Sequence, residues 1–450
     1  MRRILPALLI ALCLAVPARA AEEVRLWHAM GGALGGLLDE FVKRFNESQK
    51  EFVLLAEHRG SYEDTMIAAL QAQRAGGGPH LVQVSELGTA HMMAARKAVR
   101  PLWQIAGEGA ARIDAKAFLP AVASYFSDEQ GRLLALPFNT STPILFYNRD
   151  AFRKAKLDPE RAPKTWYEMP KAMEALSEAG FSCPYTTTWP SWVHIETMST
   201  WHNRDFATRD NGLGGLDAKL IFNTHLMVRH LSMLSSWLQS NYFSYSGRRL
   251  EGEARFLRGE CAMLTASSAS YATLRQAAGF AFGVAQLPFY DDIPGAPHHT
   301  LIGGGALWAL AGAKEGGYRG AARFFEYLSR PDVQAEWHQR TGYVPVTRAA
   351  YELTRKQGFY AANPGHEIAI RQLLLNAPTR ESRGIRLGEF PAIRAIIEDE
   401  LEAVWDGKKP PKLALDQAAE RGNALLRQFE AANRAAAPQH APPPPVRSKR

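Results

Sequence analysis

The chain has 450 residues, 46% of them hydrophobic, and a formal net charge of +8 at pH 7. This length is enough for two or three domains, each with a core of its own. The basic residues are not gathered into the stripes of a nucleic-acid-binding protein, which excludes that class. Beyond residue 20, no segment has the roughly 18 uninterrupted apolar residues of a transmembrane helix. The mild positive excess suits an anionic small ligand.

Residues 1–20 have the pattern of a secretory signal peptide. Arg2 and Arg3 are followed by an apolar run over residues 4–16 and by the small-residue pattern Ala18-Arg19-Ala20. We expect cleavage after Ala20 and release of the chain into the periplasm. At the other end, residues 435–450 are rich in alanine, proline and charge and cannot bury a core, so a disordered Pro-rich tail is predicted.

Two of the three cysteines, Cys183 and Cys261, lie outside the predicted signal peptide. An even pair in an oxidising compartment is typical of a disulfide, although two buried free thiols also fit the sequence. The chain has no CxxC or HExxH pattern. We therefore expect neither a metal site nor a cofactor.

Apolar strands alternate with amphipathic helices from residue 21 to residue 434. Residues 24–27 are predicted to form a strand, residues 34–45 a helix with one apolar stripe, and residues 81–84 a further strand. The alternation restarts with an apolar strand at residues 144–147. This pattern predicts an α/β fold with two lobes, in which ligands bind beyond the carboxyl ends of the strands, in the cleft.

Small and polar residues cluster around several of these strands, at 137–143, 261–270 and 301–305. Arg394 lies in a predicted helix that begins near Pro391. Free backbone N–H groups, hydroxyls and a guanidinium are the groups that bind a phosphate. Each segment taken singly is more often a plain turn, so only the combination indicates an anion site.

Strings spread along the chain carry a family resemblance. They include Ser141-Thr142-Pro143, Ala266-Ser267-Ser268 and Trp337-His338-Gln339. On these strings, the chain from residue 21 to Phe429 resembles the periplasmic glycerol-3-phosphate receptors of ABC importers, within the maltose-binding-protein-like group of extracellular solute-binding proteins. The resemblance implies a receptor without enzymatic activity that captures sn-glycerol-3-phosphate, or a glycerophosphodiester such as glycerophosphocholine. Its implied partners are the permease subunits of an ABC transporter, and a monomer is expected.

The resemblance also implies a set of ligand-binding residues. Tyr62 and Trp166 would contact the glycerol carbons, and Glu86 would accept hydrogen bonds from the glycerol hydroxyls. The residues implied for the phosphate are Ser141, Ser267, Gly304, Tyr343 and Arg394. Read from the residues alone, other roles remain open: Glu86 could cap a helix, Tyr62 could be a surface residue and Trp166 could belong to a core.

Trp166 also lies within a helix-start pattern. Thr165 and Glu168 have the spacing of a capping box, which would place Trp166 at the first position of a helix. Two departures from the family pattern, Ser85 and Gly305-Ala306, lie near the implied ligand and could favour larger diesters.

The resemblance implies a two-lobed periplasmic-binding-protein fold of type II, in which the chain crosses between lobes three times. The crossings are expected near residues 138–143, 265–268 and 330–331. The implied N-terminal lobe comprises 21–139 and 266–329, and the implied C-terminal lobe comprises 140–265 and 330–434.

Two other functions remain as alternatives. An oligosaccharide receptor would need several aromatic platforms and would gain nothing from a phosphate site. A secreted phosphodiester hydrolase would need a nucleophile with a base, or a metal site, and the chain has no GxSxG pattern.

Overall fold

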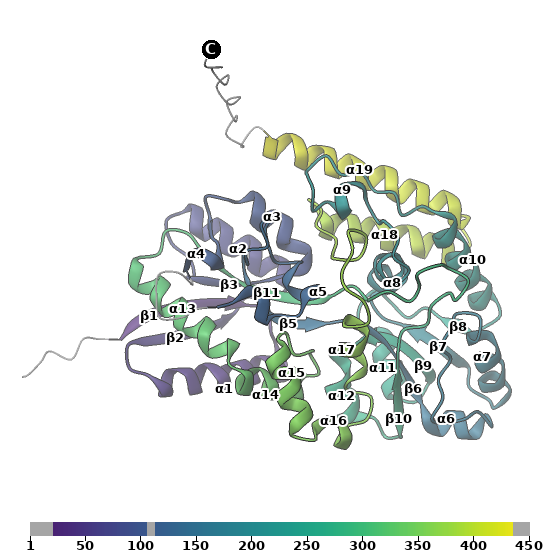
Figure 1. Cartoon of the computed structure of the whole chain (residues 1–450). Coiled ribbons are helices and arrows are strands. Elements are labelled where there is room, and N and C mark those ends of the chain that lie inside the picture. Colours follow the sequence, from purple (N-terminus) through teal and green to yellow (C-terminus); the bar gives the residue numbers. More distant parts are fainter. Residues whose placement is uncertain (1–20, 106–112, 435–450) are drawn as a thin grey trace, which may run out of the picture.

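The computed structural model describes residues 21–105 and 113–434 (Figure 1). The predicted signal peptide and the predicted Pro-rich tail both lie outside the described residues. Within the described ranges, the chain forms a mixed α/β structure with two β-sheets, and none of its helices is long and apolar enough to cross a membrane.

The first sheet is built mainly from the amino-terminal part of the chain. Its strands follow the order β2-β1-β3-β11-β4, and β5 also pairs with β11. The strands β1, β2 and β3 are parallel, whereas β11 runs antiparallel to β3. The bounds are β1 Glu22–His28, β2 Phe52–His58, β3 Leu81–Ser85, β4 Val99–Arg100, β5 Leu136–Ser141 and β11 Gly303–Leu310.

Helices α1 (Gly32–Ser48), α2 (Tyr62–Arg74) and α13 (Glu315–Ser329) pack against this sheet. The predicted apolar stripe of α1 is confirmed, because Leu37, Leu38, Phe41 and Phe45 are buried and Leu34 is partly buried. Helix α2 begins with a capping box, in which Ser61 Oγ accepts from the Asp64 N–H and Asp64 accepts from the Ser61 N–H.

The second sheet has the strand order β10-β6-β9-β7-β8. Its strands are β6 Pro143–Asn148, β7 Cys183–Thr187, β8 Phe243–Ser244, β9 Cys261–Ser267 and β10 Phe282–Ala285. The helices α7 (Met169–Glu178), α10 (His225–Gln239), α11 (Glu251–Leu257), α18 (Phe390–Trp405) and α19 (Pro411–Arg434) lie on this side of the molecule (Figure 1).

The course of the chain between the sheets differs in part from the prediction. Strand β5 ends at Ser141 in the first sheet and β6 begins at Pro143 in the second, so one crossing lies within residues 138–143 as expected. The predicted boundary at 265/266 is wrong for β10, which pairs with β6 of the second sheet. The chain next joins the first sheet at Gly303.

The helix that begins at Pro331 also departs from the predicted boundaries. In α14 (Pro331–Thr341), the ring of Trp337 packs on Phe41 and Phe138, which belong to the first-sheet side. The predicted crossing at 330–331 therefore does not hold for α14, since its apolar face is buried against that side.

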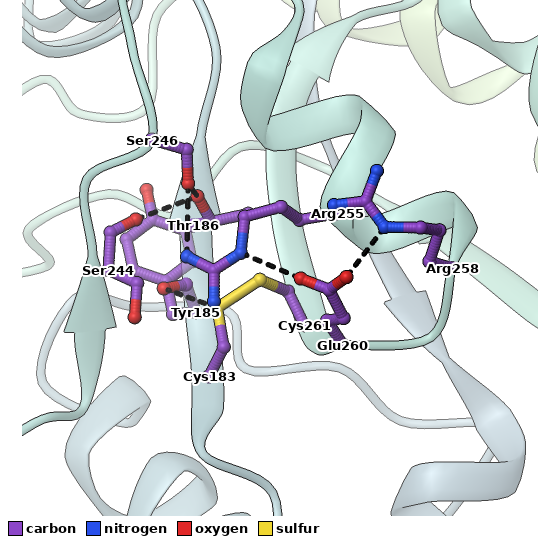
Figure 2. The surroundings of a disulfide bond; sticks show 9 residues. All are labelled: Cys183, Tyr185, Thr186, Ser244, Ser246, Arg255, Arg258, Glu260 and Cys261. Carbon is purple, nitrogen blue, oxygen red and sulfur yellow. Dashed lines mark hydrogen bonds and ion pairs between the residues drawn. A yellow bond between two sulfur atoms is a disulfide. The ribbon is translucent and has the colours of Figure 1, made fainter.

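A disulfide joins Cys183 and Cys261 within the second sheet, which confirms one of the two readings of the cysteine pair. The two cysteines lie in register on the parallel strands β7 and β9, with their Cα atoms 4.5 Å apart. In Figure 2, Glu260 lies beside the bond and pairs with Arg255 and Arg258. The bond therefore ties two neighbouring strands across a separation of 78 residues.

Replacing both Cys183 and Cys261 with alanine is expected to lower the free energy of unfolding by about 4 kcal/mol, because a loop of this length gains much entropy when its cross-link is lost. Urea unfolding of the parent and the double variant measures the difference. Equal unfolding midpoints, with equal dependence on urea, would show that the bond does not form in the protein.

Candidate functional site

Residues expected to hold a phosphate meet where the chain passes between the two sheets. Ser141, at the end of β5, pairs in register with Gly303 at the start of β11, and Thr140 pairs with Gly304. The Val344 N–H donates to Thr140 O at 2.8 Å, which brings Tyr343 alongside. Ser267, at the end of β9, lies opposite Pro143 of β6. We call this region the junction.

Gly304 allows the strands of the junction to approach closely. Its φ is +99°, a conformation that side chains rarely adopt, and a Cβ at this position would lie 1.8 Å from Asn139 O. Glycine is therefore required here both by backbone conformation and by space.

A hydrogen-bonded chain of polar side chains links Tyr62 to the junction. Asn139 Nδ2 donates to Tyr62 Oη at 2.6 Å, and Gln83 Nε2 donates to Asn139 Oδ1 at 2.9 Å. Burial raises the pKa of Tyr62 well above its usual value, and it also raises the pKa of Tyr343, against a hydrogen bond with Asn139 that lowers it. Both tyrosines are therefore neutral hydroxyls near neutral pH.

The two departures from the family pattern face each other at this place. Gly305 of β11 pairs in register with Ser85 of β3. A Cβ at Gly305 would lie 3.2 Å from Cε1 of Tyr62. The small residues thus leave space beside the tyrosine ring.

Arg394 on α18 is buried between two carboxylates. Its Nε and Nη2 donate to Glu196 at 2.8 and 2.6 Å, and its Nη2 lies 3.4 Å from Glu86 Oε1. Burial raises the pKa of Glu86 to about 7; Arg394 opposes this shift and Glu196 adds to it. Two residues expected to bind the ligand, Glu86 and Arg394, thus lie next to each other. Because its pKa is about 7, Glu86 can accept or donate a proton near neutral pH.

Glu196 was not among the predicted site residues. It is the last residue of a π-helical turn, η3 (Trp192–Glu196). Such turns are rare in proteins, but those that occur often lie at functional sites. The side chain of Glu196 has no exposed surface. No local sequence pattern marks it, since a glutamate in a helical run is ordinarily a surface residue.

The structure places Trp166 in the core beside the second sheet. A core position was the alternative to ligand binding that the sequence left open for this residue. Its side chain is 0% exposed, so the stacking role predicted for it has no surface to act on here. The surrounding rings are those of Tyr185, His194, His230 and Trp237.

The capping box around Trp166 is only half formed. The Glu168 N–H donates to Thr165 Oγ1 at 3.2 Å, but the Glu168 carboxylate accepts from the backbone N–H of Lys164 and not from that of Thr165. The helix α7 begins later, at Met169, so Trp166 is not its first residue as predicted.

Trp192 occupies the place at the junction that was expected for Trp166. A Cβ at Gly303 would lie 2.6 Å from Cζ2 of the Trp192 ring, so the indole packs directly on the strand that pairs with Ser141. Its buried Nε1 has no hydrogen-bond partner among the described residues. The sequence signal for Trp192 was its position shortly after the end of β7, because ligand-binding residues are expected beyond the carboxyl ends of the strands.

Alanine at the two tryptophans is expected to act differently. Trp166→Ala should lower the free energy of unfolding by about 3–5 kcal/mol, because it empties a core site. Trp192→Ala should lower the free energy of unfolding by less than Trp166→Ala does. It should weaken ligand binding by at least about tenfold, because the ligand loses a buried aromatic contact. Urea unfolding and calorimetric titration measure both. Stronger loss of binding in Trp166→Ala, at equal stability, would contradict this assignment.

The described residues contain no group of three or more His, Cys, Asp or Glu side chains that could hold a metal ion. The junction itself offers hydroxyls and backbone groups, and the turn that begins at Glu86, the partner of Arg394, packs against both β11 and α18. These groups can bind a polar anionic ligand that also carries hydroxyls.

The profile of the bacterial extracellular solute-binding proteins matches residues 40–367. The sn-glycerol-3-phosphate-binding periplasmic protein UgpB of Yersinia pseudotuberculosis is 46% identical over 418 residues, which cover 93% of this chain and 95% of that protein. The protein of the same name from Salmonella typhimurium is 45% identical over 418 residues, with the same shares of the two chains covered.

Two solved structures share the fold at 20% identity. UgpB from Mycobacterium tuberculosis, in complex with glycerophosphocholine, has a TM-score of 0.76 over 91% of this chain and 99% of its own. The cyclic alpha-maltosyl-1,6-maltose binding protein of Arthrobacter globiformis has a TM-score of 0.74 over 91% of this chain and all of its own. The fold is thus that of the two-lobed periplasmic binding proteins, and the chain belongs to the family of bacterial extracellular solute-binding proteins.

Proposed function

We propose that the protein is a periplasmic receptor that captures sn-glycerol-3-phosphate, or a glycerophosphodiester such as glycerophosphocholine, and delivers it to the permease subunits of an ABC transporter. The observation that carries the proposal is the meeting of Ser141, Gly304 and Tyr343 at one junction. Relatives that are 45–46% identical over most of both chains are named for binding sn-glycerol-3-phosphate, which supports this ligand.

In this proposal each part of the ligand has its own partners. The phosphate is held by the hydroxyls of Ser141, Ser267 and Tyr343, by the backbone at Gly304 and by Arg394. The glycerol hydroxyls donate to Glu86, and the glycerol carbons lie against Tyr62. Trp192 takes the place of Trp166 as the second aromatic contact.

Ligand capture is coupled to closure of the two lobes. Arg394 and Glu196 come from elements beside the second sheet, whereas Glu86 and Tyr62 come from elements beside the first. Only a closed arrangement brings both sets of groups to one ligand, so binding shifts the population towards that state. The closed receptor, a monomer cleaved after Ala20, then docks on the permease.

Calorimetric titration of the chain from Ala21 tests the proposal. We expect saturable binding of glycerol 3-phosphate or glycerophosphocholine, and no binding of maltose or other oligosaccharides. Binding of maltose alone would support an oligosaccharide receptor. Release of free alcohol during long incubation with glycerophosphocholine would instead support a hydrolase.

A further inference from the structure

The charges around Arg394 do not match a site that simply attracts anions. Arg394 provides a positive charge, but two of its nitrogen atoms already pair with Glu196. The same guanidinium lies 3.4 Å from Glu86. When both carboxylates are ionised, the three side chains together carry one net negative charge. The arginine therefore does not present an uncompensated positive charge to a ligand.

Glu196 is held firmly in this position. Its side chain is fully buried, and its Oε1 accepts a hydrogen bond from Ser191 Oγ at 2.8 Å as well as from Arg394 Nε. Moving a buried carboxylate away from its partners is costly because it would leave unpaired charges in a medium of low polarity. Glu196 is thus held in place as the ion-pair partner of Arg394, the residue that the proposed function assigns to the phosphate.

The other ionisable groups around Glu196 do not cancel its charge. Glu398, one turn further along α18, pairs with Arg249 at 2.9 Å. Tyr125, behind Glu86, donates to the backbone oxygens of Ile385 and Glu86, and burial raises the pKa of its hydroxyl, which keeps it neutral. The charge that a ligand meets is therefore set by Arg394, Glu86 and Glu196.

We propose that Glu196 is a specificity-determining residue, whose charge makes the site favour a singly charged phosphate ester over a doubly charged one. This inference rests on the proposed function. A phosphodiester carries one negative charge, whereas a phosphomonoester, with a second pKa of about 6, approaches two charges above neutral pH. At an effective dielectric constant of about 20, one buried charge within several ångströms changes affinity by about tenfold or more for each unit of ligand charge.

The test compares glycerol 3-phosphate with glycerophosphoglycerol, whose only charge is that of its phosphodiester, on the parent protein and on Glu196→Gln at pH 8.0 and pH 5.5. Glutamine keeps the shape of the side chain and an acceptor for Arg394 Nε, but it loses the charge. Loss of one hydrogen bond to Arg394 should lower the affinity for both ligands alike, whereas loss of the negative charge should raise the affinity for the monoester relative to the diester. At pH 8.0 the dissociation constant of the monoester relative to the diester should fall about tenfold in Glu196→Gln. At pH 5.5, where the monoester is mostly singly charged, the ratio should change little.

Glu400→Gln is the matched control. Glu400 is a buried glutamate on the same helix, but its partners are Lys409 and Arg421. This variant should leave the ratio at its parent value. An unchanged ratio in Glu196→Gln at pH 8.0, with both ligands still bound, would overturn the inference and leave the proposed function intact. Failure of both ligands to bind the parent protein would refute the proposed function itself.

A second measurement on the parent protein does not depend on folding of a variant. Titration at pH 7.5 in two buffers of different ionisation enthalpy gives the number of protons taken up on binding. A site that favours a singly charged ester should take up more protons with glycerol 3-phosphate than with glycerophosphocholine. Equal uptake with the two ligands would count against the inference.

Discussion

Replacing Arg394 with alanine is expected to weaken binding of a phosphate ester by about thirtyfold to several thousandfold, the cost of removing one partner of a buried charge pair. The hydroxyls of Ser141, Ser267 and Tyr343 would remain, but Glu86 and Glu196 would lose the guanidinium with which they pair. Arg394→Lys should restore binding in part, because an ammonium cannot make the paired contact with Glu196 that a planar guanidinium makes. Calorimetric titration with glycerol 3-phosphate measures each loss.

The structure adds an effect on stability to the effect on binding. Without Arg394, the buried Glu196 and Glu86 lose their counter-charge, and breaking such a pair costs about 3–5 kcal/mol. The pKa of Glu86, already about 7, should rise further. The folded variant then binds protons that the unfolded chain, with an ordinary glutamate pKa near 4.3, releases. The free energy of unfolding of the variant should therefore fall as the pH rises from the pKa of Glu86 in the unfolded chain to its higher pKa in the folded variant.

Urea unfolding at pH 5 and pH 8 measures this dependence. The deficit of Arg394→Ala relative to the parent should be larger at pH 8 and should shrink towards pH 5 as Glu86 becomes protonated. Arg421→Ala is the control, since Arg421 is itself half-exposed and its buried partner Glu400 keeps a second cation, Lys409, when Arg421 is removed. A deficit that is equal at both pH values would show that the carboxylates are not left unpaired.

The sequence predicts local elements better than it predicts their partners. The period of apolar residues indicated α1 and the strands at 24–27, 81–84 and 144–147, because burial of one face acts over a few residues. That pattern does not say which sheet a strand joins. Strand β10 was assigned to the wrong side for this reason, since its pairing with β6 depends on residues more than a hundred positions earlier.

The same limit explains the candidate site. Family resemblance supplied Tyr62, Glu86 and Arg394, and the structure brings the last two together. Resemblance and capping pattern together favoured Trp166, although the packing that decides between a core and a site tryptophan is three-dimensional. Glu196 was missed because its partner, Arg394, lies 198 residues further along the chain.

Gly304→Ala is the substitution from which we expect the largest combined loss of stability and binding. The backbone at residue 304 has a φ of +99°, and the new Cβ would lie 1.8 Å from Asn139 O, a backbone atom that cannot move alone. Strain at such a conformation costs about 1–3 kcal/mol. Overpacking of a closed site adds about 1–3 kcal/mol. The free energy of unfolding should therefore fall by several kcal/mol.

Binding should suffer through the same displacement. Moving Asn139 shifts the side chain that holds Tyr62, and it shifts Thr140, whose carbonyl accepts the Val344 N–H next to Tyr343. Gly312→Ala separates the two causes, because Gly312 has a φ of +90° but no atom within 4 Å of a new Cβ. It should show only the conformational cost of about 1 kcal/mol, with unchanged affinity. If the two variants unfold at the same urea concentration and bind glycerol 3-phosphate equally well, the close approach at Gly304 does not shape the site. A larger loss in Gly304→Ala alone would show that contact between β5 and β11 sets the geometry of the junction.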